Sequence, residues 1–270
     1  MIQHGDIKVD GTSVSGVATA LVLHPYKVCV DIGVCTPEAA KCRWVFITHA
    51  HIDHLGAAAQ HAAIRDMQGM EPSKFVCSAE VAGGLRRLLD LWNEIQEQQP
   101  FRYEIMVLNP GELLPIGKGV KVRAFSTFHR LPSQGYAFIR TKTPLKAQFV
   151  GLSGAEIGKL VRAGIDVQDR VEVVELVCPG DTKVTALAND FVRQAKVVVA
   201  EATFLDDAVT VAEAQEKGHT HLAEIVAHQD WLAGCECVVL THFSARYGAE
   251  DIAKAVAKLP DGLRERVQAL

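Results

Sequence analysis

The stretch THAHIDH, residues 48–54, directly follows an apolar segment, WVFI, that is typical of a buried strand. It places four candidate metal ligands, three imidazoles and one carboxylate, within six residues. On a tight loop between a strand and a helix, alternate side chains can point to two neighbouring positions. His49 and His51 can therefore bind one ion while Asp53 and His54 face a second. Imidazole and carboxylate ligands suit zinc or manganese, so the stretch predicts a dinuclear metal site.

The composition indicates a globular protein. The chain has 270 residues, of which 49% are hydrophobic, and a net charge of −4, which argues against a surface that coats nucleic acid generally. No apolar run approaches the ~20 residues that span a bilayer. Seven cysteines at irregular spacing are typical of reduced thiols, and the N-terminus lacks the pattern of a secretory signal. We expect an intracellular, cytoplasmic protein without membrane association, with the nucleus and organelles left open.

Short strands come first along the chain, and helices alternate with strands later. Segments rich in β-branched or aromatic residues predict strands, and apolar residues at helical spacing then predict two helices. The strands are Val17–Leu23, Lys27–Asp31 and Trp44–Thr48, and the helices are Leu55–Met70 and Ala79–Gln99. No linker interrupts the pattern. We expect a single domain, residues 1–270, with a mixed sheet core flanked by helices.

The histidine stretch is the signature of the metallo-β-lactamase superfamily, which this chain resembles in the order of its further ligand candidates. His129 closes a predicted strand, Asp181 follows an extended segment, and His242 ends a late strand. Site residues collect at such strand ends in α/β folds. The resemblance implies an α/β fold of the metallo-β-lactamase type, a four-layer αββα sandwich of two mixed β-sheets flanked by helices. It also implies seven ligands, with Asp181 bridging both ions: His49, His51, Asp53, His54, His129, Asp181 and His242.

Several other stretches resemble one branch of that superfamily, ribonuclease Z, and its plant short-form group above all. They are HRLPSQGY (129–136), GLSG (151–154), AEATF (200–204), GHTH (218–221) and THFSARY (241–247). The similarity runs from Asp31 to the end of the chain. It implies a zinc-dependent endoribonuclease that removes the 3′ trailer of precursor tRNA and leaves a 3′-hydroxyl. It further implies two Zn²⁺ per chain, with Mn²⁺ as the alternative, and a homodimer.

The resemblance also implies roles for individual residues. Two metal ions lower the pKa of bound water, and Asp53 would orient or deprotonate that water. Glu201 and His219 would form a carboxylate–imidazole pair that protonates the leaving group, with His221 as the alternative donor. Ser244 and Arg246 come shortly after the ligand His242 and are candidates to hold the scissile phosphate. For Arg246, a surface ion pair is the alternative.

Two other functions remain open at this stage. One is a phosphodiesterase or other hydrolase with a small substrate at the same site, and the other is a non-catalytic RNA-binding scaffold. Scaffold members should have lost ligands, whereas this sequence keeps all seven. Only 52 positions separate His129 from Asp181, which predicts little room for the protruding arm by which bacterial members grip the tRNA elbow.

Overall fold

Two mixed β-sheets form the centre of the computed structural model, which describes residues 1–97 and 99–270. In the first sheet the strands follow the order β1-β2-β3-β4-β5-β6-β7, and β14 pairs with β2. The strands are β1 (Ile2–His4), β2 (Ile7–Ser15), β3 (Ala18–Leu23), β4 (Val28–Val30), β5 (Trp44–Phe46), β6 (Ser73–Cys77), β7 (Tyr103–Val107) and β14 (Phe243–Ser244). The first four pair antiparallel and β4 to β7 pair parallel.

The second sheet has the order β15-β13-β12-β11-β10-β9-β8. Its strands are β8 (Leu113–Gly117), β9 (Val120–Ser126), β10 (Gln134–Lys142), β11 (Val171–Gly180), β12 (Val197–Glu201), β13 (Cys237–Thr241) and β15 (Val267–Ala269). Strands β8 to β11 pair antiparallel, whereas β11, β12, β13 and β15 pair parallel. The carboxyl ends of these parallel strands lie at the same edge of the sheet, so residues that follow different strands can come together there.

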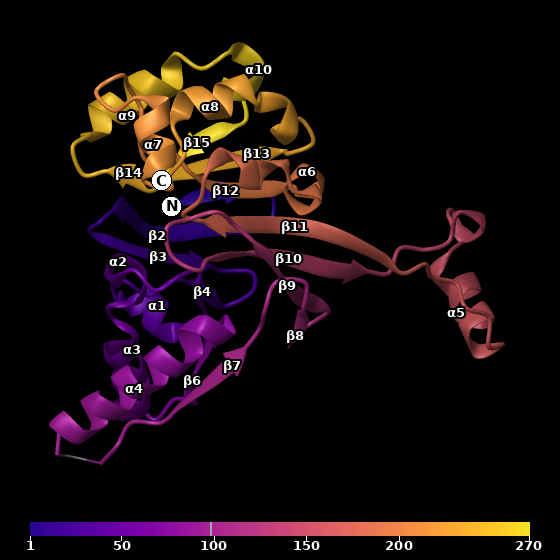
Figure 1. Cartoon of the computed structure of the whole chain (residues 1–270). Helices are drawn as coiled ribbons and strands as arrows, with labels where there is room; N and C mark the ends of the chain where they lie inside the picture. Colours follow the sequence, from indigo (N-terminus) through magenta and orange to yellow (C-terminus); the bar gives the residue numbers. More distant parts are fainter. Residues whose placement is uncertain (98) are drawn as a thin grey trace.

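Helices cover the outer face of each sheet (Figure 1). Those over the first sheet are α1 (Pro37–Lys41), α2 (Ile52–Leu55), α3 (Ala58–Met67) and α4 (Ala79–Ile95). Those over the second sheet are α6 (Asp190–Gln194), α7 (Val211–Glu216), α8 (Leu222–Ala227), α9 (Ala249–Ala257) and α10 (Asp261–Arg264). Short 3₁₀ turns connect further segments, η1 (Ala147–Phe149), η2 (Val184–Ala188) and η3 (Gln229–Leu232).

Alternation along the strands produces three apolar layers. In β12, Val197 and Val199 face the first sheet, while Val198 and Ala200 face the helices, because successive strand side chains point to opposite faces. The central layer takes side chains from both sheets. Separate layers lie under the two helical sides. This is the four-layer αββα arrangement that the sequence predicts.

Some predicted boundaries were wrong. The predicted helix Leu55–Met70 is two helices, α2 and α3, and the chain turns at Gly56 between them, where an added Cβ would meet the backbone of Ile52 at 2.6 Å. The predicted helix Ala79–Gln99 ends at Ile95, and Gln98 lies outside the described residues. Strand β2 was missed because Asp10-Gly11 interrupts its apolar alternation.

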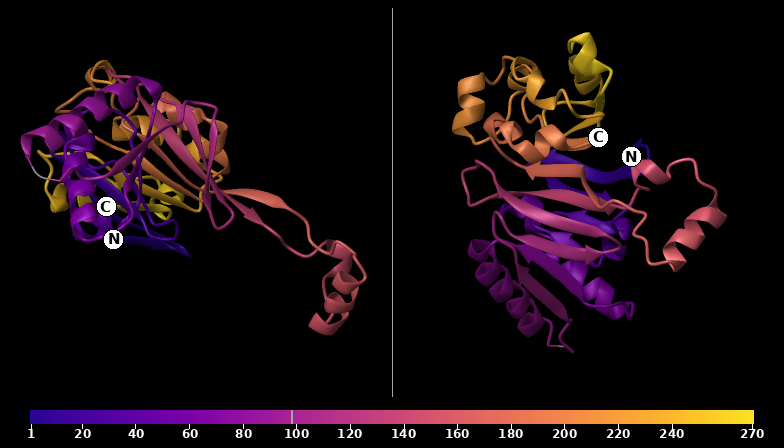
Figure 2. Two further views of the ribbon diagram at one scale, coloured as in Figure 1. Left: turned by 90° about the horizontal axis from the view of Figure 1, so that it is seen from below. Right: turned by 90° about the vertical axis from the view of Figure 1, so that its right-hand side faces the viewer.

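The chain has a protruding arm, contrary to the sequence prediction. Strands β10 and β11 pair as far as Lys142 and Val171, and they carry η1 and α5 (Gly154–Arg162) far from the sandwich (Figure 2). None of the α5 residues is buried. Few residues suffice for such an arm because a strand advances about 3.4 Å per residue.

Among the described residues, no helix has both the length and the apolar character needed to cross a membrane.

Candidate metal centre

The seven predicted ligands come together at one end of the sandwich. The loop after β5 and the first turn of α2 carry four of them, with His51 at the N-terminal cap of α2. His129 follows β9, Asp181 follows β11, and His242 lies between β13 and β14. All seven are buried or half-buried, and they form two adjoining groups: His49, His51, His129 and Asp181 in one, and Asp53, His54 and His242 in the other.

The first group surrounds His51. Nδ1 of His51 lies 2.9 Å from Nε2 of His49 and 3.2 Å from Nε2 of His129. Nε2 of His49 is 3.8 Å from Oδ2 of Asp181. Ligand atoms about 2.0–2.2 Å from a tetrahedral ion lie roughly 3.3–3.6 Å apart. The separations here scatter around that range, so shifts of a few tenths of an ångström would let the four side chains hold one metal ion.

The second group adjoins the first through Asp181. Nε2 of His54 and Nε2 of His242 lie 3.2 Å apart, and Oδ2 of Asp53 is 3.6 Å and 3.7 Å from them. Oδ2 of Asp181 is 3.3 Å from His54 and 3.2 Å from His242. One carboxylate therefore faces both groups, which is the bridging position that the sequence predicts for Asp181.

The far nitrogens of the rings are held by hydrogen-bond acceptors, which orients the near nitrogens toward the metal groups. Nδ1 of His129 donates to the backbone carbonyl of Gly218 at 2.7 Å. Nδ1 of His54 donates to Oδ2 of Asp31 at 2.8 Å. Each ring then directs Nε2 to its group, the orientation in which metal-binding imidazoles are usually held.

The same holds for the other two Nε2 ligands. Nδ1 of His49 lies 3.0 Å from the hydroxyl of Thr48, and Nδ1 of His242 lies 3.0 Å from that of Thr203. Both hydroxyls donate to carboxylates, so both accept from the rings. Nε2 of His54 and Nε2 of His242 face each other at 3.2 Å, a separation that suits two ligands of one cation. The donor set fits a divalent metal.

The buried carboxylate of Asp181 favours positive charge around it. Burial alone would raise the pKa of Asp181, but His242, His54 and His49 hold it well below its ordinary value. Burial opposes protonation of His54, yet Asp181 and Asp31 raise its pKa. A bound divalent metal would supply the positive charge that these histidines otherwise provide to Asp181.

Three residues that support the ligands were missed by the sequence interpretation. Asp31, buried and with φ of +60°, accepts from His54 and from both the N–H and the hydroxyl of Thr48. Thr203 supports His242 in the same way. A carboxylate directly after the strand at Val28–Val30 was the available signal for Asp31. Nothing local marks either threonine.

Glu201 and His219 lie beside the metal groups. Nδ1 of His219 is 3.2 Å from each oxygen of Glu201, whose carboxylate also accepts from the N–H groups of Thr182 and Thr220. Burial would lower the pKa of His219, but the charge of Glu201 raises it above its ordinary value. The His219 ring centroid lies 5.5 Å from that of His242, so the pair borders the second group.

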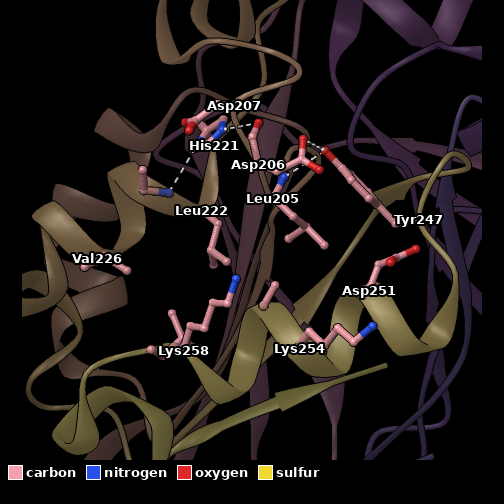
Figure 3. Close-up of a pocket in the computed structure, with 13 residues that line it drawn as sticks. Leu205, Asp206, Asp207, His221, Leu222, Val226, Tyr247, Asp251, Lys254 and Lys258 are labelled. Atoms are coloured by element: carbon pink, nitrogen blue, oxygen red, sulfur yellow. Dashed lines mark hydrogen bonds between the residues drawn. The ribbon is translucent and has the colours of Figure 1, made fainter.

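His221 lies elsewhere. Its Nδ1 accepts from the N–H of Ala223, which caps α8, and its Nε2 bonds the backbone carbonyl of Asp206 at 3.1 Å. Figure 3 shows the ring at the edge of a separate pocket whose far side carries Lys254 of α9 and Lys258, the residue that caps the C-terminus of α9. The structure therefore brings His219, and not His221, to Glu201.

The two predicted phosphate contacts lie at the rim. Ser244 is on β14, and its N–H donates to the carbonyl of Thr203. The exposed Arg246 guanidinium lies 5.9 Å from the ring centroid of Phe204, and Phe204 in turn packs edge-on to His219 at 6.2 Å. Among the described residues Arg246 has no ion-pair partner within 4.0 Å.

Comparison with known proteins extends this picture along the sequence. Residues 34–157 match the sequence family described as the beta-lactamase superfamily domain. A tRNase Z of Arabidopsis thaliana is 36% identical over 265 residues, 97% of this chain and 94% of the relative. A chloroplastic tRNase Z of the same plant is 33% identical over 262 residues, 96% of this chain and 73% of the relative.

Solved structures agree on the fold. The human short-form tRNase Z superposes with a TM-score of 0.64 at 19% identity, covering 98% of this chain and 95% of that chain. A metallo-beta-lactamase fold protein of Bacillus subtilis gives 0.65 at 13% identity over the same shares. At these identities the structural likeness shows the fold alone, whereas the plant sequences match over almost the whole chain.

Proposed function

Because this chain belongs to the tRNase Z family of metal-dependent hydrolases, we propose that it is an endoribonuclease that removes the 3′ trailer of precursor tRNA and leaves a 3′-hydroxyl. The observation that carries the proposal is the shared carboxylate of Asp181 between two imidazole groups, with the Glu201–His219 pair alongside. The protruding arm supports a tRNA substrate, because the resemblance assigns tRNA binding to such an arm in bacterial members.

Two Zn²⁺ per chain are the proposed cofactors, with Mn²⁺ as the alternative. His49, His51, His129 and Asp181 would hold one ion, and Asp53, His54 and His242 would hold the other with Asp181. Five imidazoles and two carboxylates without a thiolate match the ligand preference of both metals. When bound, such a pair lowers the pKa of water and stabilises charge on a phosphate.

Asp53 orients the attacking water. Its Oδ2 accepts from the N–H of Gly16 at 2.8 Å. Burial would raise the pKa of Asp53, but His242, His54 and that N–H hold it below the ordinary range. A carboxylate with so low a pKa is a weak base, so positioning, and not proton removal, is the role we assign.

His219 protonates the leaving 3′-oxygen. Because Glu201 engages Nδ1 and favours the protonated ring, Nε2–H is the group left to donate to the leaving oxygen. His221, the alternative donor, is occupied as a helix cap. Arg246 and Ser244 hold the scissile phosphate from the rim, since a guanidinium matches phosphate geometry.

A homodimer is the proposed assembly. Helix α4 exposes an apolar stripe, and a hollow of about 500 Å³ opens between one residue of this stripe, Trp92, and Ala63 of α3. An i, i+3, i+4, i+7 pattern on one exposed helix flank suits a partner surface. The stripe consists of Leu88, Leu91, Trp92 and Ile95.

Charges beside the stripe favour a second copy as the occupant. Arg87 and Glu94 flank the stripe on its solvent side at opposite ends, and among the described residues neither has an ion-pair partner within 4.0 Å. Two copies of α4 packed antiparallel about a two-fold axis bring Arg87 of each against Glu94 of the other. In a two-fold dimer each copy presents the same surface to the other, so the pair of Arg87 with Glu94 forms twice.

The proposed functional unit is the whole chain, residues 1–270, as one domain, supported by the apolar layer that both sheets share. The proposed location is the cytoplasm. All seven cysteines are free thiols, which suits a reducing compartment. An organellar form is the alternative, since one relative is chloroplastic.

The test incubates purified protein with a precursor tRNA and with bis(p-nitrophenyl) phosphate, with and without a chelator. We expect cleavage of the precursor to a 3′-hydroxyl product, lost with the chelator and restored by Zn²⁺. Metal analysis should find two ions per chain, and Asp181→Ala should lose at least one. Cleavage of the small diester alone would favour the small-substrate hydrolase, and cleavage of neither by metal-loaded protein would favour the scaffold.

A further inference from the structure

The backbone of Phe128 is held to the metal centre from two sides. Phe128 directly precedes His129, and its N–H donates to the hydroxyl of Thr182 at 2.9 Å. Its carbonyl accepts from the N–H of Lys183 at 2.9 Å. Thr182 and Lys183 directly follow Asp181, so the position of Phe128 relative to both metal groups is fixed by the chain itself.

The side chain, by contrast, contributes little to the core. Phe128 is 52% exposed, whereas Phe125 and Phe204 are 4% and 6% exposed. The ring borders two open hollows. One, of about 560 Å³, contains His129, Arg130 and Lys183, and the other, of about 460 Å³, contains Arg123 and Phe191. A rigidly mounted aromatic face thus stands in an open groove next to a predicted metal ligand.

Cations line the groove on both sides of the ring. Arg130 packs over Gly218, where an added Cβ would lie 3.3 Å from Cγ of Arg130. Within the described part of the chain, neither Arg130 nor Lys183 forms an ion pair within 4.0 Å. Glu80 is an acidic residue of the same hollow. Free cations beside an exposed ring fit a phosphate backbone that carries a base.

We propose that Phe128 is a stacking platform for the nucleobase next to the scissile phosphate, with Arg130 and Lys183 contacting the adjoining phosphates. The inference rests on the proposed function and adds the substrate contact that selects a single-stranded RNA segment at the metal centre. An aromatic face stacks on any base, and single-stranded RNA is commonly bound through such stacking. The base comes either from the tRNA side or from the trailer side of the cleaved bond.

The experiment compares Phe128→Ala and Phe128→Trp with the control Val107→Ala, a residue of similar exposure on edge strand β7 that lines neither hollow. Substrates are a precursor tRNA and two versions with one abasic nucleotide, directly 5′ or directly 3′ of the cleaved bond. Stacking on a side chain predicts that Phe128→Ala raises KM about 5- to 150-fold with kcat little changed. Phe128→Trp should restore the wild-type KM, and Val107→Ala should leave it unchanged.

The abasic substrates identify the stacked base. At the stacked position, wild type and Phe128→Ala should have the same KM, and the other abasic substrate should keep their difference. An unchanged KM for Phe128→Ala on the natural precursor overturns the proposal, and so does a difference that persists on both abasic substrates. Metal content and thermal midpoint are measured for each variant, and Phe128→Trp tests the same point if Phe128→Ala fails to fold.

A second readout separates this inference from the proposed function. If the wild type cuts no precursor tRNA, the proposed function fails, and a single-stranded RNA carrying 2-aminopurine then tests Phe128 alone. Quenching by wild type and by Phe128→Trp, but not by Phe128→Ala, would support the platform. Equal quenching by all three proteins would overturn it.

Discussion

Oδ2 of Asp31 lies 2.8 Å from Nδ1 of His54, and the same carboxylate accepts from the N–H and hydroxyl of Thr48. The hydroxyl of Thr48 lies in turn 3.0 Å from Nδ1 of His49. One buried acid therefore orients a ligand of each metal group, His54 directly and His49 through a hydroxyl.

The first prediction concerns this acid. Asp31→Asn should weaken metal binding about 10- to 100-fold, because the partner that orients a ligand imidazole sets its tautomer and basicity. Competition with a chromogenic chelator measures the affinity. Asp66→Asn, which removes a carboxylate paired with Arg102 on the surface, should bind metal like wild type. Equal affinity in all three proteins would contradict the role of Asp31.

The second prediction uses two glycines of similar conformation. Gly180 and Gly69 have φ of +70° and +66°, but an added Cβ meets Thr48 at 2.7 Å only at Gly180, and Gly69 has open space. Each change to alanine should cost about 1–2 kcal/mol of unfolding free energy from backbone strain. Only Gly180→Ala should also lose metal affinity, since Thr48 supports His49. Denaturant titrations measure the stability of both variants, and chelator titrations measure their metal affinity. Equal metal affinity in the two variants would contradict a role for the contact with Thr48.

The third prediction identifies the proton donor. His219→Ala should slow cleavage of natural RNA roughly 10²–10⁴-fold, and it should regain most activity on RNA with a bridging 3′-sulfur, a leaving group that needs no proton. His221→Ala should instead lose about 0.5–2 kcal/mol of stability, the usual effect of removing a helix cap, with kcat nearly kept on both substrates. Single-turnover rates measure both variants. If His221→Ala, and not His219→Ala, regained activity on the sulfur-containing RNA, His221 would be the proton donor. Equal losses of activity on both substrates for both variants would exclude both histidines as donors.

The fourth prediction addresses the α4 stripe. Leu91→Glu should be monomeric by sedimentation velocity at concentrations where wild type is dimeric, because a carboxylate would be buried in the apolar contact. Val107→Glu, equally exposed elsewhere, should stay dimeric. Arg87→Glu should weaken the dimer, and adding Glu94→Arg should restore it. A monomeric wild type, or a dimeric Leu91→Glu, would rule out this interface.

The fifth prediction is a pH dependence remote from the metal. Burial lowers the pKa of His61 to about 4, although the carbonyls of Ala39 and Cys42 oppose this effect. Since the unfolded chain then binds more protons than the folded chain, this contribution to stability is complete above the unfolded pKa of about 6.5 and is lost as the pH falls towards 4.

The size of the effect is about 3 kcal/mol, because a tenfold change in proton affinity corresponds to roughly 1.4 kcal/mol. His61→Gln keeps a polar side chain without a titrating proton, so its unfolding free energy should fall less than that of wild type between pH 7 and pH 4.5. Denaturant titrations across this range measure the difference. Parallel pH profiles would show that His61 titrates normally in the folded chain.

The sequence alone determined the parts of this protein that depend on local chemistry. Four ligands in six residues cannot be spread apart by any fold, so residues 48–54 predicted metal binding before any tertiary contact was known. The order of the further ligands matched the metallo-β-lactamase superfamily, and that resemblance implied the fold. Periodicity also placed most of the strands, since burial on one or both faces requires apolar residues at fixed spacing.

Tertiary structure decided whatever depends on residues far apart in the sequence. His219 and His221 differ by two positions, and only the packing of α8 shows that one meets Glu201 and the other caps a helix. Asp31 supports the ligands because β4 and β5 are neighbours in the sheet, a pairing that no local pattern encodes. The arm was mispredicted from a residue count because the count fixes contour length, whereas the pairing of β10 with β11 decides how far that length extends from the sheet.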